Sequence, residues 1–416
     1  MSNESAIKPF MLAIADAQLE DLRNRLGIVR WPPRETVKAQ DGSASHLQVI
    51  PLQATKEMHK YWSSKYDWRK CESWFNKHPQ FTYTSTIDNK SDRVYFMHIR
   101  SKHNNATPML MVHGWPGSVL EFHKVIGPLA DPTRYGGEED DAFHLVIPAL
   151  PGYAWSSQPD YIGCNFSHIS KVFVNLMAEL GYDKQGWVAQ GGDWGADIIA
   201  EMASSDPPES LLAVHMNTAF FNAAHEIETS KAKSEGVTPE EIAALKKSTH
   251  FENNGYGYFL QQATRPQTLS YSLSDSPIGL ASWIYEKLWA WTQHAGNSGN
   301  PVGFHDLLSY DEILDNIMLY WLSNSGASSV RLYWEAKTDN TALPIKIPVG
   351  VSIFPGDLVT APKKWGERYY DNIVHWREVE RGGHFAAWEV PELFVREVRE
   401  TFRKAMLLRE RRWNCQ

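Results

Sequence analysis

The stretch Gly191-Gly192-Asp193-Trp194-Gly195 decides the fold of this chain. It follows a short apolar run at residues 187–189 and precedes a helical pattern at residues 196–203. A strand, a sharp turn and a helix, with glycines on both sides of one reactive residue, form a nucleophile elbow, a strained turn that is crowded by its neighbours. The competing interpretation is a glycine-rich turn with Asp193 as a helix N-cap. Candidate partners later in the chain favour the elbow.

An aspartate at the nucleophile position of an elbow sets the chemistry. A carboxylate with a reference pKa of about 3.9 is ionised at neutral pH and attacks without the help of a base. The attack leaves an ester, which water must then cleave. The base for that second step should be a histidine oriented by a carboxylate, in the chain order nucleophile, acid, histidine.

That order is present in the sequence. Asp357 follows a strand candidate at residues 345–354, and His384 follows a strand candidate at residues 373–379. Loops behind strand ends are where sites lie in open α/β sheets. We therefore expect Asp357 to orient His384, with Asp371 as the rival for the acid. The competing interpretations are a turn residue for Asp357 and a surface histidine for His384.

Strand and helix patterns alternate on both sides of the elbow. Strand candidates cover residues 93–100, 108–112, 144–148, 187–189, 211–216, 345–354 and 373–379, and helix candidates cover residues 16–26, 167–180, 196–203, 361–368 and 391–408. This alternation predicts an α/β fold with a mostly parallel sheet covered on both faces.

One long stretch interrupts the alternation. Residues 218–338 have helical patterns and many aromatic side chains, but no strand candidate. We expect them to form a helical cap over the carboxyl ends of the strands. The sheet domain then has two parts, residues 91–217 and 339–416, and the Trp- and Pro-rich residues 1–90 form an N-terminal segment wrapped around both core and cap.

Composition excludes several classes of protein. The 416 residues are 43% hydrophobic and 22% charged, with a formal net charge of −8, which fits a globular protein and argues against nucleic acid as a partner. The three cysteines form no disulfide framework and no CxxC pair, which favours a reducing, cytoplasmic location. With no signal-peptide pattern and no run of 18 apolar residues, we expect a soluble protein without a transmembrane anchor. We expect no cofactor and no metal.

A second loop should complete the site. His113-Gly114-Trp115-Pro116-Gly117 follows the strand candidate at residues 108–112. In hydrolases with an elbow, this loop gives one backbone N–H to the oxyanion hole. We expect the donors to be the backbone N–H groups of Trp115 and Trp194, and His113 to brace the loop. We also expect the Trp115–Pro116 peptide bond to be cis, since only X–Pro bonds adopt this form readily.

Together these motifs resemble those of the epoxide hydrolases of the α/β-hydrolase fold. The stretches that resemble the microsomal type are residues 31–33, 66–70, 76–81, 264–269 and 275–281. The resemblance covers residues 10–408, nearly the whole chain. We expect this chain to have no membrane anchor like that of the animal members, because it is similar to soluble fungal and bacterial ones. Its acid is Asp357, as in some of those, where the animal enzymes carry Glu.

The resemblance implies further site residues. A pair of cap tyrosines donates hydrogen bonds to the epoxide oxygen, and the matching positions are Tyr258 and Tyr333, with Tyr256 as rival for the first role. A phenol with a pKa of about 10 stays protonated and can stabilise the developing alkoxide. The implied reaction converts a small apolar epoxide and water to a vicinal diol through an ester on Asp193.

Other readings of the same residues stay open. A haloalkane dehalogenase also uses an elbow Asp and a His base, but the cap and N-terminal motifs argue against it. A protein that has the hydrolase fold but only binds ligands has usually lost one of the three catalytic residues, and all three are present here. A cyclase that lets a substrate hydroxyl open the epoxide would keep the same residues. Substrate identity, a detoxifying or biosynthetic role, and a homodimer are also undecided.

Overall fold

The computed structural model describes residues 6–37, 50–204, 206–233, 235–294, 302–336 and 343–413. Within them, one nine-stranded sheet has the order β1-β2-β3-β5-β4-β6-β7-β8-β9. The strands are β1 (Ile7–Phe10), β2 (Gln80–Ile87), β3 (Lys90–Ile99), β4 (Thr107–Val112), β5 (Phe143–Pro148), β6 (Trp187–Gly191), β7 (Leu211–Met216), β8 (Val349–Ile353) and β9 (Ile373–Glu378). Strands β4 to β9 run parallel, whereas β1, β2 and β3 pair antiparallel. This confirms the α/β class and the mostly parallel sheet.

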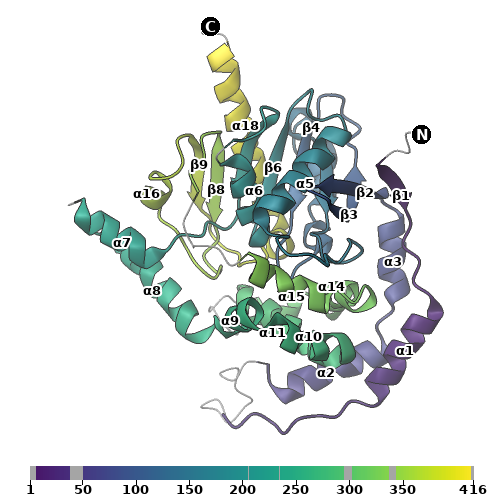
Figure 1. Ribbon diagram of the computed structural model, residues 1–416. Coiled ribbons are helices and arrows are strands. Elements are labelled where there is room, and N and C mark those ends of the chain that lie inside the picture. The colour runs from purple at the N-terminus through teal and green to yellow at the C-terminus, as the bar shows by residue number, and fades with distance from the viewer. Residues whose placement is uncertain are drawn as a thin grey trace.

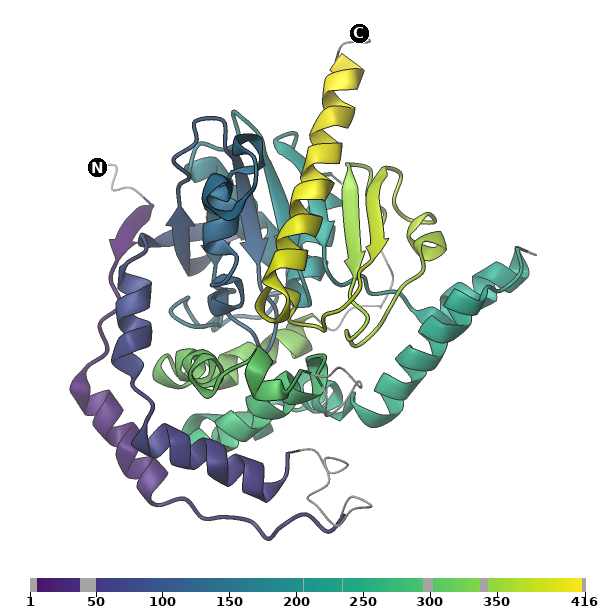
Figure 2. The ribbon, with the colours of Figure 1, turned by 180° about the vertical axis from the view of Figure 1, so that it is seen from behind.

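Helices cover both faces of the sheet. α5 (Phe166–Glu179) and α6 (Trp194–Ala203) pack on one face (Figure 1), and α4 (Ile126–Ala130) and α18 (Pro391–Trp413) pack on the other (Figure 2). The short helix α16 (Lys363–Gly366) and the 3₁₀ turn η2 (Val119–Phe122) lie in loops between strands, and the short helix α17 (Ala386–Glu389) lies between β9 and α18. No helix in the described residues is both long enough and apolar enough to cross a lipid bilayer.

The helices between β7 and β8 lie beyond one end of the sheet (Figure 1). They are α7 (Ala223–Ala232), α8 (Pro239–Asn254), α9 (Gly257–Thr264), α10 (Pro266–Asp275), α11 (Pro277–Trp291), α13 (Phe304–Leu307), α14 (Tyr310–Leu322) and α15 (Gly326–Glu335). From α14, the Asn316 amide donates to the Pro116 carbonyl at 2.8 Å and the Tyr320 hydroxyl to the Gly117 carbonyl at 2.6 Å. Because this loop follows β4, the cap helices face the carboxyl ends of the parallel strands.

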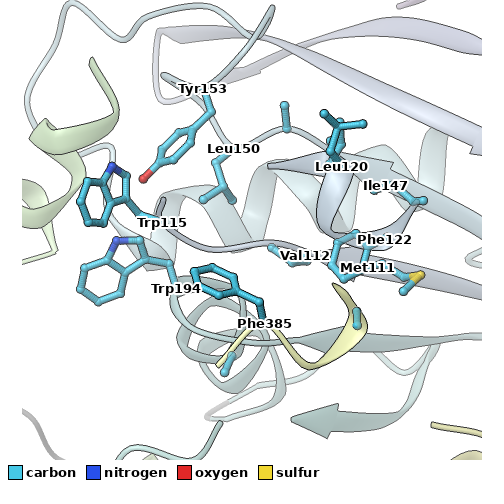
Figure 3. Packing of buried hydrophobic residues seen from close by; sticks show 14 of the residues in the cluster. Met111, Val112, Trp115, Leu120, Phe122, Ile147, Leu150, Tyr153, Trp194 and Phe385 are labelled. Atoms are coloured by element: carbon cyan, nitrogen blue, oxygen red, sulfur yellow. The ribbon is translucent and has the colours of Figure 1, made fainter. Parts of the chain in front are cut away.

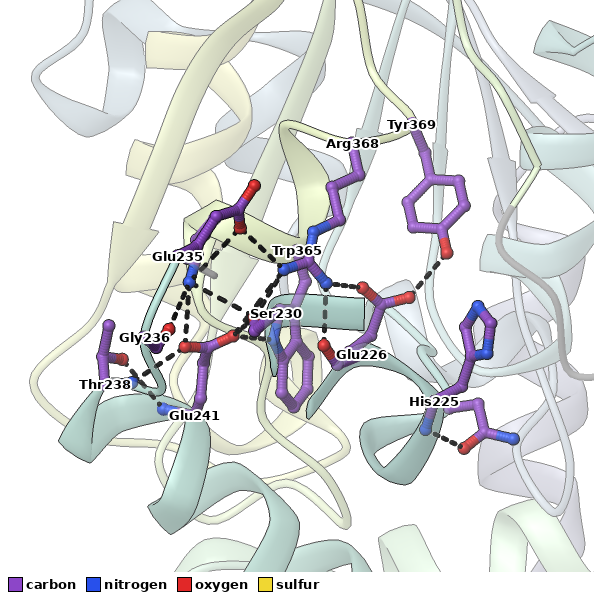
Figure 4. Close-up of polar contacts among 12 residues, drawn as sticks. His225, Glu226, Ser230, Glu235, Gly236, Thr238, Glu241, Trp365, Arg368 and Tyr369 are labelled. Atoms are coloured by element: carbon purple, nitrogen blue, oxygen red, sulfur yellow. Dashed lines mark hydrogen bonds and ion pairs between the residues drawn. The ribbon is translucent and has the colours of Figure 1, made fainter. Parts of the chain in front are cut away.

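The first two cap helices are tied to the core by buried carboxylates (Figure 4). Glu226 accepts hydrogen bonds from Arg368 and, at 2.6 Å, from the hydroxyl of Tyr369. Glu241 accepts from the indole N–H of Trp365 at 2.9 Å and from the hydroxyl of Ser230 at 2.7 Å. Buried charges are tolerated when they are paired in this way. The network fixes α7 and α8 against α16 and so anchors the start of the cap.

The N-terminal segment contains more structure than expected. The sequence predicted one helix before residue 90, whereas the structure has α1 (Asp16–Gly27), α2 (Leu52–Ser64) and α3 (Trp68–Asn76) as well as β1 and β2. These elements run along the cap and the core (Figures 1 and 2). Hydroxyls of Tyr61 and Tyr66 donate to Asp311 and Asp315 of α14 at 3.0 and 2.6 Å.

Two predicted elements after the cap are shorter than expected. The strand expected at residues 345–354 begins only at Val349, because Pro348 has no N–H to donate to a neighbouring strand. Ile345 forms an isolated bridge to Tyr370 instead. The helix expected at residues 361–368 is the single turn of α16.

Candidate active site

Asp193 lies at the turn between β6 and α6, with the backbone angles φ 50° and ψ −131°. A positive φ is strained for a residue with a side chain and occurs at functional turns. A methyl group on Gly191 or Gly195 would collide with backbone atoms of Gly195 and Val112, respectively. Only glycine therefore fits on either side of this turn, and the geometry is that of an elbow.

The Asp193 carboxylate is held from two sides. The backbone N–H of Trp115 donates to Oδ1 at 2.7 Å, and Nε2 of His384 lies 3.4 Å from Oδ2. A Cβ on Gly114 would overlap the Asp193 side chain, so the loop after β4 packs directly on the carboxylate. The Trp115–Pro116 bond in this loop is cis, as expected from the sequence. Trp194 is the first residue of α6, so its N–H has no acceptor within the helix and stays available as a second donor.

Asp357 and His384 form a buried pair. Nδ1 of His384 lies 2.6 Å from Oδ1 of Asp357. The carboxylate also accepts from the Leu358 N–H at 2.7 Å and from the Thr218 hydroxyl at 2.8 Å. Burial alone would raise the pKa of Asp357, but the neighbouring His384 and these hydrogen bonds hold it below its ordinary value. The rival acid, Asp371, lies outside this contact, just before β9.

His384 carries a proton in this arrangement. Burial disfavours its charged form, but the charge of Asp357, reinforced by Asp193, raises the pKa of His384 well above its usual range. An imidazolium between two carboxylates leaves the site with one net negative charge.

The loop that carries His384 is fixed by Glu389, which the sequence analysis did not single out. The Glu389 carboxylate accepts from the N–H groups of Gly383 and Phe385, both at 3.0 Å, and from that of Gln293 at 2.8 Å. The His384 N–H itself donates to the Trp291 carbonyl at 2.9 Å. The only signal in the sequence is the position of Glu389, five residues after His384.

The cap supplies the two tyrosines. Tyr258 of α9 and Tyr333 of α15 are 7% and 1% exposed, and their ring centroids are 5.8 Å apart. Tyr258 stacks on Trp115 at 5.4 Å, and Tyr333 contacts Trp194 at 4.6 Å. Burial, with the charge of Asp193 as a further cause, raises the pKa of both phenols well above its usual range, so both stay protonated.

The alternative residue for the first role lies elsewhere. Tyr256 stacks on Phe259 at 4.5 Å and contacts Phe251, and its side chain is half-buried. In contrast, Tyr258 and Tyr333 contact the two Trp residues next to Asp193. With Tyr153, these Trp side chains carry the buried core up to the cap (Figure 3). The structure thus brings Asp193, Asp357, His384, Tyr258 and Tyr333 to one place.

Two further groups border this site. His113 accepts from the Leu150 N–H at 3.3 Å, and its other ring nitrogen lies 2.9 Å from the Gly114 carbonyl. Burial lowers its pKa to about 4, so it is a neutral brace for the loop, as expected. Glu121 of η2, which the sequence analysis missed, packs over Gly117, where a Cβ would overlap its carboxyl group. Burial raises the pKa of Glu121 to about 8, against the charge of His384.

Comparisons with known proteins agree with this geometry. The family described as "Epoxide hydrolase N terminus" matches residues 7–122, and the family described as "alpha/beta hydrolase fold" matches residues 107–277. Epoxide hydrolase 1 of Sus scrofa is 32% identical over 96% of this chain and 89% of its own length. The chain belongs to the epoxide hydrolase family. The resemblance seen in the sequence and the α/β-hydrolase fold are thereby confirmed.

Two other family members are similar over nearly the same length. A Stigmatella aurantiaca protein, provisionally named an epoxide hydrolase, is 45% identical over 96% of this chain and 85% of its own. The crystal structure of juvenile hormone epoxide hydrolase from the silkworm Bombyx mori superimposes with a TM-score of 0.83 at 30% identity, covering 98% of this chain and 96% of that one. The N-terminal segment, core and cap of this hydrolase are therefore all shared with the family.

Proposed function

We propose that this epoxide hydrolase opens its substrate with Asp193 as a covalent nucleophile and cleaves the resulting ester with water activated by His384 and Asp357. One observation carries the proposal: a carboxylate at an elbow lies between a histidine–aspartate pair on the core side and two protonated tyrosines on the cap side. The first pair suits ester cleavage and the second suits opening of an epoxide.

In the first half-reaction, Oδ1 of Asp193 is held by the Trp115 N–H, which leaves Oδ2 to attack an epoxide carbon. The new bond joins Oδ2 to that carbon, and the carbon–oxygen bond of the epoxide breaks. The departing alkoxide takes a proton at the tyrosine pair. Both phenols are protonated because burial raises their pKa, so they are donors over the whole working range of pH.

The first half-reaction also prepares the base. Esterification removes the negative charge of Asp193, which is one of the two charges that raise the pKa of His384. The pKa of His384 therefore falls when the ester forms. The proton that His384 gives up balances the proton that the alkoxide receives, so no net charge enters or leaves the site.

In the second half-reaction, neutral His384 takes a proton from water and the hydroxide adds to the ester carbonyl. The N–H groups of Trp115 and Trp194 stabilise the oxyanion that forms. Collapse of this intermediate breaks the bond between carbonyl carbon and alkyl oxygen. The diol leaves with the proton of the transient carboxylic acid, and the site returns to an ionised Asp193 beside a protonated His384.

One turnover in heavy-oxygen water, with enzyme in excess, tests this order of events. The oxygen that enters the diol comes from Asp193, so the label should appear in the peptide that contains Asp193 and not in the diol. Asp193→Asn is the control and should form no covalent adduct. A labelled diol with an unlabelled peptide would mean direct attack of water on the epoxide.

The same experiment addresses the cyclase alternative, since attack by a substrate hydroxyl leaves neither the peptide nor the product labelled. A cytoplasmic location and an apolar substrate stay predictions, which cell fractionation and a substrate panel would check. Cys71 and Cys164 form no disulfide bond, as is usual in a reducing compartment. The division into residues 1–90, 91–217, 218–338 and 339–416 also stays a prediction, and limited proteolysis would check it.

A further inference from the structure

A buried lysine lies against one of the two proposed proton donors. Lys287 of α11 is 5% exposed, and its Nζ lies 4.6 Å from the centroid of the Tyr258 ring. The rings of Trp283 and Trp291 lie 5.7 and 5.8 Å from the same Nζ. Three aromatic rings thus surround one ammonium group.

Burial of the Lys287 charge is costly, and its partners offset that cost only in part. Lysine is almost never fully buried unless it is paired. Burial lowers the pKa of Lys287, and the adjacent Glu286, its ion-pair partner, opposes that shift. On the same helix, Ile284 and Leu288 are buried apolar residues, so an apolar side chain would suit this face. The aromatic faces compensate in part, because they attract cations.

The two tyrosines differ in this respect. In the described residues, each cation–π contact of Lys287 involves Tyr258 or a neighbouring Trp, and none involves Tyr333. The rings around Tyr333 belong to uncharged residues: Trp115, Trp194, Tyr258 and Phe259. A positive charge over a phenol ring stabilises negative charge that develops on the phenol oxygen, and of the two tyrosines only Tyr258 has this contact. Glu286, which pairs with Lys287, acts in the opposite direction and raises the pKa of Tyr258, so the charge of Lys287 is needed to offset it.

We propose that Lys287 makes Tyr258 the stronger acid of the pair, so that Tyr258 transfers the proton to the opening epoxide while Tyr333 only donates a hydrogen bond. The inference rests on the proposed function, in which the tyrosine pair protonates the alkoxide. Lys287 is a positioning residue, because it acts through Tyr258 and touches no reacting atom. Its charge matters in the first half-reaction and has no part in ester cleavage.

Single turnovers that measure ester formation and ester cleavage separately test the proposal. Lys287→Met removes the charge at similar length and should slow ester formation about tenfold, the effect of roughly one pKa unit on a proton transfer. Ester cleavage should stay within about twofold of the wild-type rate, which a general loss of structure would not allow. Lys287→Arg keeps the charge and should restore most of the rate. Lys287→Gln serves as the neutral variant if the Met variant does not fold.

A double-mutant cycle separates this inference from the proposed function. In a Tyr258→Phe background, Lys287→Met should cause no further loss, whereas in a Tyr333→Phe background it should cost the same factor as in the wild type. If Tyr258→Phe slows ester formation and Lys287→Met does not, the inference about Lys287 is wrong and the proposed function stands. If Tyr258→Phe itself leaves ester formation unchanged, the proposed function fails first.

Discussion

The core side and the cap side of the site are built on different principles. On the core side, Asp357 accepts three hydrogen bonds and the loop of His384 is fixed by Glu389. On the cap side, Tyr258 and Tyr333 are held mainly by ring contacts, and their two hydroxyls interact with each other. Charged groups hold the base in place, whereas aromatic rings enclose the phenols.

This difference matches the two proposed half-reactions. Ester cleavage needs a base in a fixed orientation, and a saturated network supplies it. Epoxide opening needs donors that can turn to the substrate, and two neutral phenols that interact with each other give up less than a donor held by a charged group. Changes on the core side should therefore affect ester cleavage, and changes on the cap side should affect ester formation.

Replacement of the base, His384, should cause the largest loss of activity among the changes on the core side. His384→Gln should reduce turnover by on the order of 10⁴–10⁶, the range seen when a catalytic base is lost. Ester formation does not need a base, so the variant should accumulate one equivalent of adduct, visible as a mass increase equal to that of the substrate. Free enzyme with no adduct after long incubation would contradict the separation of the two half-reactions.

Replacement of the phenols should break the cap side. Tyr258→Phe and Tyr333→Phe should each slow ester formation by roughly 10²–10⁴, the range typical of general-acid steps, with the larger loss for Tyr258→Phe, and the double variant should be slower still. Stopped-flow single turnovers measure the rate. Tyr256→Phe is the matched control and should behave as wild type. Wild-type ester formation by the double variant would exclude the tyrosine pair.

His384 was predicted from its place behind the last strand, and the two tyrosines were predicted from the family resemblance. The elbow was predictable because it needs glycines at fixed positions. The strand Leu211–Met216 was predictable because it is a mostly apolar run. The strands β1 and β2 were not predicted because β1 is a four-residue edge strand and β2, next to it, mixes buried and exposed residues and has three threonines. Pro348 cut β8 short, which the apolar pattern did not reveal.

Residues that act through backbone contacts were also missed. Glu389 reaches N–H groups on two separate loops, and no sequence pattern announces which carboxylate will do so. The aromatic surroundings of Lys287 come from α9 and α11, which meet only in the folded chain. Sequence patterns identify the reacting residues. The residues that hold them in place can be identified only from the packing of the folded chain.

Glu389 offers a smaller test of the core side, because its carboxylate holds the loop of His384. Glu389→Gln places an amide N–H₂ among three backbone donors, so at least one hydrogen bond to the His384 loop is lost. Ester cleavage should slow by about tenfold, corresponding to about 1.4 kcal/mol, while ester formation should stay within about twofold. Glu392→Gln is the matched control, because in the part of the chain that the structure describes Glu392 has one ion pair, with Arg381, and both side chains are exposed. Equal loss in both steps would indicate a general structural defect instead.

Glu121 gives the smallest expected effect, a change in how stability depends on pH. Burial raises the pKa of Glu121 to about 8 in the folded protein, whereas an unfolded Glu titrates at about 4.3. Between these values the folded state binds more protons than the unfolded state, so this residue lowers stability as the pH rises from about 4.3 to about 8. Glu121→Gln mimics the protonated form and should make the fall in Tm between pH 5 and pH 8 shallower. Thermal unfolding of both proteins at unit pH steps measures the slopes. Parallel slopes would mean that Glu121 is ionised in the folded state, and the core side would then hold a further negative charge in addition to Asp193 and Asp357.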